Sequence, residues 1–209
     1  MKKLFSFVFA AGLIGSLAAC GGNEQKAQAD QTQAGNTADA VIENIMTRTS
    51  IRQFTDQPIA KDTLDKIVRA GMAAPSAVNA QPWAFVVVTE KNVLDSLNAV
   101  HSHANLKTAT AAVIVCGDMA KAMEGEGREF WVQDCSAATE NILLAAHAYG
   151  IGAVWCGVYP IQERVKAVQT VLGMPENIVP LDIITMGYPA ENPTPKDKFK
   201  ADNIHYQKW

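Results

Sequence analysis

Apolar positions along this chain follow two different spacings, which predict helices alternating with buried strands. Apolar residues recur every three or four positions at 41–46, 59–72, 93–100, 129–149 and 161–172, as in helices with one buried face. Gly150 and Gly173 follow the last two segments and are expected to cap them. Nearly continuous β-prone runs at 83–89, 111–116, 153–158 and 181–186 predict buried strands, the first of them covered on both faces. This order of elements predicts an α+β fold.

The region 1–38 follows neither spacing and indicates an export signal followed by a tether. Lys2 and Lys3 precede an apolar stretch too short to span a bilayer, which predicts a secretory signal over 1–19. Leu17-Ala18-Ala19-Cys20 resembles the bacterial lipobox, which implies a lipid on Cys20; a plain signal peptide is the alternative. Residues 20–38 are rich in Gln, Ala, Asn and Gly, as in a flexible tether, and the folded domain is expected over 39–209. We therefore expect an exported protein, lipid-anchored to the cell envelope and facing the periplasm.

Composition and charge exclude several classes of function. The chain is 48% hydrophobic and 19% charged, which is typical of a packed globular protein, and its net charge of -3 offers no basic field for nucleic acid. Without Cys20 the cysteine count is odd and contains no CxxC pair, so a disulfide framework is not expected. His101 and His103 have no acidic or cysteine partner at metal-ligand spacing, so we expect solvated histidines and no metal site.

The densest candidate chemistry lies just after the first predicted helix. Arg48, Ser50 and Arg52 place two guanidinium groups and a hydroxyl within about one helical turn, a combination that suits a phosphate group; a solvated helix end is the alternative interpretation. The small polar loop over 75–83 is bounded by proline and suits the border of a planar ring. The segment 119–131, rich in Gly and Glu and ending in Trp131, is either a lid over such a ring or an ordinary exposed helix start. The run from Arg48 to Arg52 and the loop over 75–83 together predict a site for an aromatic cofactor with a phosphate tail.

These motifs resemble those of the nitroreductase family of oxidoreductases, which depend on flavin mononucleotide (FMN). The resemblance runs from Val41 to the C-terminus. It rests on Arg-x-Ser-x-Arg-x-Phe at 48–54, Pro-Ser-x-x-Asn-x-Gln-Pro-Trp at 75–83, the helical run at 138–152 and Gly-Tyr-Pro-Ala-Glu at 187–191. It implies a three-layer sandwich in which helices flank a mixed or antiparallel sheet, assembled as a homodimer. It also implies FMN as the cofactor.

The resemblance assigns FMN contacts to particular residues. Arg48 and Ser50, with Lys196 and Lys198 of the tail, would bind the phosphate, and Arg52 would lie beside the pyrimidine edge of the flavin. The other subunit would contribute three residues that border the ring. These are Pro75, Ser76 and Asn79. Cys156 and Gly157 would present backbone N–H groups to flavin N5 and O4, and Thr49 stands where many relatives carry arginine or histidine. Because the flavin performs the reaction, no catalytic side chain is expected.

The resemblance therefore implies an NAD(P)H oxidoreductase. Hydride would pass from a reduced donor, NAD(P)H or another, through flavin N5 to a nitroaromatic, a quinone or a similar acceptor. Export conflicts with this chemistry, because nicotinamide nucleotides are cytosolic reductants. The alternative is a membrane-anchored FMN carrier or electron-transfer protein without NAD(P)H turnover, and a third possibility is a relative that performs dehydrogenation or reductive dehalogenation at the same site.

Overall fold

The computed structural model describes residues 37–209. The predicted signal over 1–19, Cys20 and most of the predicted tether therefore lie outside the described residues. The chain divides into two compact units, Met1–Ile42 and Glu43–Trp209, and the description below concerns the second. The first helix occupies 37–47 and ends directly before Arg48, as the sequence predicts. No helix within 37–209 is both long enough and apolar enough to cross a membrane.

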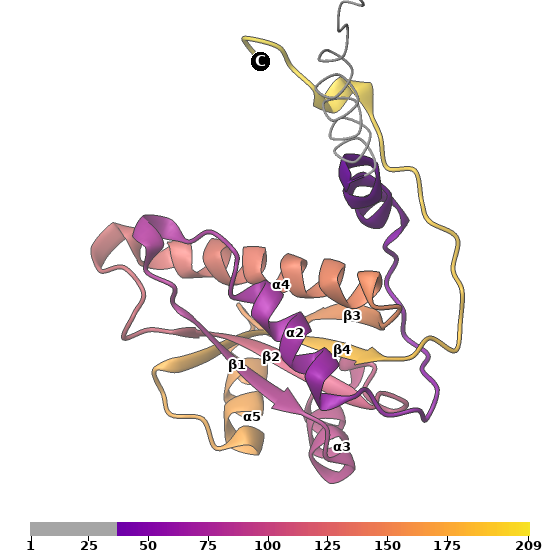
Figure 1. The fold of residues 1–209 in the computed structure, drawn as a ribbon. Helices are drawn as coiled ribbons and strands as arrows, with labels where there is room; N and C mark the ends of the chain where they lie inside the picture. The colour runs from indigo at the N-terminus through magenta and orange to yellow at the C-terminus, as the bar shows by residue number, and fades with distance from the viewer. Residues whose placement is uncertain (1–36) are drawn as a thin grey trace, which may run out of the picture. The chain divides into compact units, whose positions relative to one another are not determined.

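A four-stranded sheet forms the middle of the larger unit (Figure 1). Its strands are β1 (Trp83–Val88), β2 (Ala111–Asp118), β3 (Gly152–Gly157) and β4 (Ile178–Gly187), in the order β1-β2-β4-β3. Every neighbouring pair is antiparallel. The central strands β2 and β4 are buried almost throughout, as expected from their apolar runs. The predicted α+β fold is confirmed, and the sheet is antiparallel.

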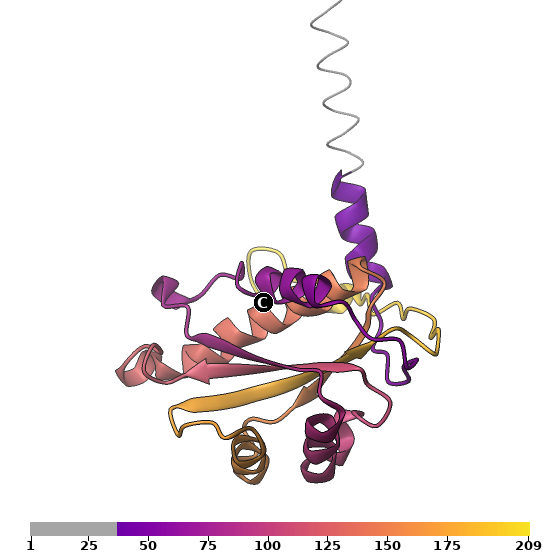
Figure 2. The same ribbon diagram turned by 60° about the horizontal axis from the view of Figure 1, so that its bottom comes forward.

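Helices cover both faces of this sheet and complete three layers, which Figure 2 shows nearly edge-on. One face packs against α2 (Lys61–Gly71) and α4 (Phe130–Ala148). The other face packs against α3 (Lys91–Val100) and α5 (Gln162–Leu172). Short 3-10 helices lie at Ala77–Asn79, Ser102–Ala104, Gly125–Glu129 and Ala201–Asn203. Gly150 and Gly173 adopt φ of +70° and +61°, which confirms both predicted caps, since a side chain is disfavoured in that backbone conformation.

One expectation about burial is wrong. β1 lies at the edge of the sheet, and Val87 is 43% exposed, so the helices do not cover both faces of this strand along its whole length. Trp131 is only 2% exposed and meets Tyr159 edge-on, with ring centroids 4.9 Å apart. Trp131 is therefore a core residue, whereas the helix start before it is largely exposed, with Phe130 44% exposed.

The bulky side chains at the end of the sequence, Ile204, His205, Tyr206 and Trp209, predict that the C-terminal tail docks, on this chain or on a partner subunit, and no docking occurs within a single chain. Phe199 is 71% exposed and Trp209 is 99% exposed, so the bulky side chains at this end remain in solvent. Trp209 stacks only on His205, with ring centroids 4.0 Å apart. Docking on a second subunit stays a prediction.

Candidate functional site

The segment after the first helix lies along the free edge of β3. Ser50 forms an isolated parallel bridge with Ala153, and the Ile51 N–H donates to the Ala153 carbonyl at 3.0 Å. The Ala153 backbone groups therefore point away from β4. Because successive residues of a strand alternate, the N–H and C=O groups of Trp155 and Gly157 point to the same outer edge. Beyond Ala153, this edge offers backbone hydrogen-bond donors to a ligand.

Gly157 is an accessible point on this edge. It is exposed, and a Cβ built on it would meet no atom within 4 Å, so open space lies beside its Cα. Cys156, by contrast, is 6% exposed and turns its thiol inward, with Sγ 3.4 Å from the Ala104 carbonyl. The Gly157 backbone is what a planar ring could approach, whereas the Cys156 backbone N–H faces β4, so the predicted contact from the Cys156 N–H is not available at the outer edge.

Arg52 is close enough to this strand to act on it electrostatically. Burial raises the pKa of the Cys156 thiol, and hydrogen bonds from Asn105 and Thr185 and the positive charge of Arg52 partly oppose that rise. Arg52 is exposed, and its backbone N–H donates to Glu191 Oε1 at 2.5 Å. The Gln53 N–H donates to the same oxygen at 3.1 Å, so one carboxylate fixes the backbone that carries Arg52. The predicted residues Ser50, Arg52, Cys156 and Gly157 are thus brought together.

Arg48 and Thr49 line a pocket of about 310 Å³, together with His147 of α4 and Pro193 and Pro195 of the tail, and this pocket adjoins the β3 edge through Ala153. The Arg48 side chain is 17% exposed, and its Nε lies 3.7 Å from Glu140 Oε1. A largely buried guanidinium with hydroxyl neighbours is suited to an anion. Burial lowers the pKa of His147, and the Arg48 charge lowers it further, so His147 adds little positive charge at neutral pH.

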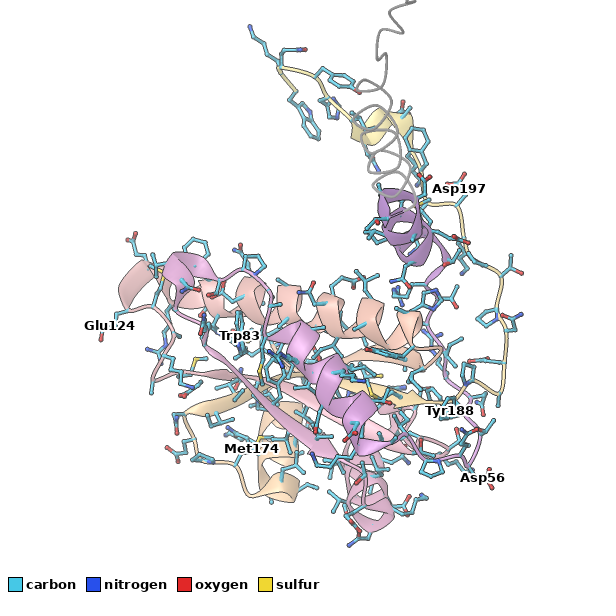
Figure 3. The ribbon with its side chains drawn as sticks, viewed as in Figure 1. Asp56, Trp83, Glu124, Met174, Tyr188 and Asp197 are labelled. Atoms are coloured by element: carbon cyan, nitrogen blue, oxygen red, sulfur yellow. The ribbon has the colours of Figure 1, made fainter. Side chains whose placement is uncertain are left out.

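The tail lysines do not line this pocket in a single chain. Lys196 and Lys198 are exposed and lie just beyond Pro195. In Figure 3, Tyr188 marks the end of β4, and Asp197, between the two lysines, lies on the tail after it has left the sheet. The structure therefore brings the start of the tail to Arg48 but does not bring the two predicted phosphate-binding lysines into contact with it.

The loop over 75–81 is held in an unusual backbone conformation. Val78, Asn79 and Gln81 have φ of 49°, 56° and 49°, which non-glycine residues rarely adopt. Asp134 Oδ1 accepts the Ala77 N–H at 2.8 Å. Such strain persists only where surrounding contacts hold it, and it is concentrated at functional sites.

Within one chain this loop is distant from the edge of β3 that carries Ser50 and Arg52. Its anchor, Asp134, lies in the first half of α4, whereas His147 beside Arg48 lies in the last turn. At 1.5 Å rise per residue, these positions are about 20 Å apart along the helix. Pro75, Ser76 and Asn79 are therefore separated from the other predicted site residues, as expected if they serve the site of a second subunit.

A buried carboxyl lies directly behind the site. Asp182 pairs with Gly157 across the sheet and is 0% exposed. Burial raises its pKa well above the ordinary value, while the hydrogen bond with Thr139 opposes the rise. The Thr139 hydroxyl donates to Asp182 Oδ2 at 2.9 Å and lies at the same distance from the Cys135 carbonyl, which competes for its single proton.

Sequence reasoning missed four residues that organise the site. They are His101, Asp134, Asp182 and Glu191. Asp182 carried a signal, since it is a charged residue inside an apolar strand, and Glu191 was part of a quoted motif. His101 was expected to be solvated, but it is 4% exposed and its Nε2 lies 3.0 Å from the Gly157 carbonyl, because the turn after α3 folds it against β3. Within residues 37–209, no group of three or more His, Cys, Asp or Glu side chains is able to hold a metal ion.

Comparisons with known proteins agree with this geometry. A sequence model of the nitroreductase family matches residues 45–104 and 98–188. A protein of Methanothermobacter thermautotrophicus, named provisionally as an NADH dehydrogenase/NAD(P)H nitroreductase, is 46% identical over 171 residues, which cover 81% of this chain and 87% of that protein.

Solved structures extend the likeness to the fold. A protein of Bacteroides thetaiotaomicron with the same provisional name superposes with a TM-score of 0.76 at 42% identity, covering 81% of this chain and 98% of that one. A provisionally named nitroreductase of Desulfovibrio desulfuricans, solved in complex with FMN, gives a TM-score of 0.68 at 29% identity, covering 81% and 97%. Motifs, fold and relatives agree, and the chain belongs to the nitroreductase family.

Proposed function

We propose that this chain is an FMN-dependent oxidoreductase that passes hydride from NADH or NADPH to an electron-poor acceptor such as a nitroaromatic or a quinone. One observation carries the proposal: the free edge of β3 presents Gly157 to open space with the Arg52 cation nearby. A backbone donor and a fixed cation at one edge are what a flavin ring needs. The FMN named in a relative's structure and the NAD(P)H in another's name support this assignment.

Bound FMN would supply the hydride chemistry at its N5 atom, while the protein binds and orients the ring. The Gly157 N–H would orient N5, and Arg52 would stabilise the negative charge that reduction places on the pyrimidine edge. Arg48, Thr49 and Ser50, with Lys196 and Lys198, would hold the phosphate. Lysine contacts phosphate as a point charge without the paired geometry of arginine, so Lys198 would contribute charge rather than orientation.

A homodimer would complete the site. The loop that carries Ser76 and Asn79 is separated from Arg48 by most of the length of α4. Val78 at the tip of this loop is 80% exposed, and the aromatic side chains of the tail are also exposed. Apolar groups left in solvent on a monomer mark contact surfaces. We infer that a second copy buries them and places Pro75, Ser76 and Asn79 against the flavin.

The test is flavin binding followed by reduction. The purified full chain is expected to bind FMN, to turn yellow, and to lose its visible absorption when NADH or NADPH is added without oxygen. Arg52→Ala is expected to weaken FMN binding at least tenfold, since losing one partner of a buried charge contact costs about 2–5 kcal/mol. Lys166→Ala, which removes an exposed cation from α5, is the matched control and should bind FMN normally.

The outcomes separate the competing functions. A yellow protein that nicotinamide nucleotides do not bleach would favour the carrier or electron-transfer alternative, or a different donor. A colourless chain that cannot take up FMN would exclude the oxidoreductase and the carrier or electron-transfer protein alike. Steady-state rates with a quinone acceptor should fit a ping-pong scheme, because donor and acceptor would use the same cleft in turn.

We also propose that the protein is exported and held at the cell envelope by a lipid on Cys20. The basic start, the short apolar stretch and the lipobox-like sequence support this location. Expressed in a bacterium, the full chain is expected to partition into the detergent phase of a Triton X-114 extract. Cys20→Ala should move it to the aqueous phase, and equal partitioning of the two would contradict lipidation.

A further inference from the structure

Two long side chains from different elements converge on a single backbone carbonyl, that of Gly157. His101, at the end of α3, places Nε2 at 3.0 Å from this oxygen. Arg164, in the first turns of α5, donates from Nη1 to the same oxygen at 3.3 Å. They approach from the α3–α5 layer. A carbonyl at the exposed end of an edge strand would ordinarily bond to water, so two protein donors on one such oxygen require explanation.

These donors compensate for the flexibility of glycine at this position. Gly157 has no side chain to pack, and its outer side is open. Glycine has more backbone freedom than any other residue, so its own φ and ψ preferences do not fix the direction of its backbone groups. Pairing with β4, including the bond from the Val158 N–H to the Leu181 carbonyl at 2.9 Å, holds only the inner side of the strand. Two hydrogen bonds to the Gly157 carbonyl restrict that freedom, and the bond from Arg164 is strengthened by the guanidinium charge.

The protonation state of His101 is compatible with this role. Burial lowers the pKa of His101, the hydrogen bond to Gly157 opposes that change, and the charges of Arg164 and His103 lower the pKa further. At neutral pH the ring is therefore neutral and donates through the proton on Nε2. Because His101 is 4% exposed, this donor has little access to water and its bond to Gly157 is not readily exchanged.

We propose that His101 and Arg164 are positioning residues: they hold the Gly157 carbonyl, restrict rotation about the Gly157 Cα, and so help to keep the N–H of the preceding peptide directed at the flavin ring. This inference rests on the proposed function, and it adds two residues that touch neither the flavin nor the substrate. The two side chains also occupy the carbonyl oxygen, so that its lone pairs do not face the electron-rich edge of a bound ring.

The test compares variants that remove the donors with variants that keep them. His101→Leu and Arg164→Met remove one donor each, while His101→Gln and Arg164→Lys retain one. His103→Gln is the matched control, because His103 lines the same pocket of about 480 Å³ as His101 and Arg164. For each variant, FMN affinity is measured by fluorescence titration, the bound flavin is examined by absorption spectroscopy, and its two-electron midpoint potential is determined.

We expect the variant carrying both His101→Leu and Arg164→Met to bind FMN about tenfold more weakly. Its bound flavin should show a displaced absorption band and a shifted midpoint potential. If the substitutions weaken the binding of oxidised and reduced FMN to extents that differ tenfold, the two-electron midpoint potential should shift by about 30 mV. The donor-keeping variants should recover most of the wild-type spectrum and potential, and His103→Gln should match the wild type.

A purely structural role would lower thermal stability in the variant lacking both donors without moving the spectrum or the potential of the flavin that remains bound. That result would overturn the inference and leave the proposed function intact. If the wild-type chain binds no FMN, both the proposed function and this assignment fail. If the donor-keeping variants behave like the donor-removing ones, hydrogen bonding to Gly157 is not the cause, and the assignment is again wrong.

Discussion

Asp182 makes the stability of this protein depend on pH in an unusual direction. Its side chain is 0% exposed, and the only hydrogen-bonding group recorded beside it is the Thr139 hydroxyl, with Oδ1 unpaired among the described residues. Burial of this kind favours the neutral carboxyl, so the folded-state pKa lies well above the ordinary 3.8. Folding therefore takes up a proton. The resulting stability is fully present below the ordinary pKa and is lost as pH rises towards the folded-state pKa.

The magnitude follows from linkage. One proton taken up on folding lowers the free energy of unfolding by about 1.4 kcal/mol for each pH unit within that window. Asp182→Asn has nearly the same shape and cannot ionise, so its stability should lack this contribution. We expect the stability of Asp182→Asn relative to wild type to increase as pH rises from 5 to 7, by about 1.4 kcal/mol for each pH unit that lies below the folded-state pKa of Asp182. Urea denaturation of the flavin-free proteins at several pH values measures this difference.

Asp118 provides the matched control. Burial pulls its pKa upward, but hydrogen bonds from the Ala120 N–H and Asn177, together with Lys121, outweigh burial and leave the pKa below the ordinary value. Its contribution is therefore lost only as pH falls below about 4, so Asp118→Asn should differ from wild type by a constant amount between pH 5 and pH 7. The same comparison can refute the reasoning. If the free energy of unfolding of Asp182→Asn also differs from that of wild type by a constant amount between pH 5 and pH 7, the Asp182 carboxyl is ionised in the folded protein.

Three further outcomes follow from the packing. Gly117→Ala should lower the free energy of unfolding by about 1–3 kcal/mol, since its Cβ would lie 2.4 Å from the Trp131 ring; an unchanged denaturation midpoint would contradict this. Gly157→Val should leave flavin-free stability within about 0.5 kcal/mol of wild type, since its Cβ meets open space, yet weaken FMN binding at least tenfold by titration. Asp134→Ala should destabilise the protein by about 1–3 kcal/mol in urea, because it leaves the Ala77 N–H unpaired, and should release FMN more readily.

The sequence predicted the elements well because helices and strands depend on local spacing. The helix over 37–47 ends before Arg48, α4 and α5 are followed by glycines with positive φ, and the four apolar runs became the four strands. Such features involve residues within a few positions of one another, and the backbone geometry that relates them is fixed. The candidate segment at 48–52 was found for the same reason, since its charged and hydroxyl groups are neighbours in the sequence.

The arrangement around Gly157 was decided only by the tertiary structure. His101 and Gly157 are separated by 56 positions, and Arg52 and Glu191 by 139, so no local spacing could pair them. The sequence likewise gave no means of placing β1 and β3 at the two edges of the sheet. An edge strand and a central strand can carry the same apolar residues, because only the neighbour across the sheet determines whether the backbone N–H groups are paired or free. The free edge of β3, on which the proposed flavin site depends, is a property of packing rather than of any segment of the chain.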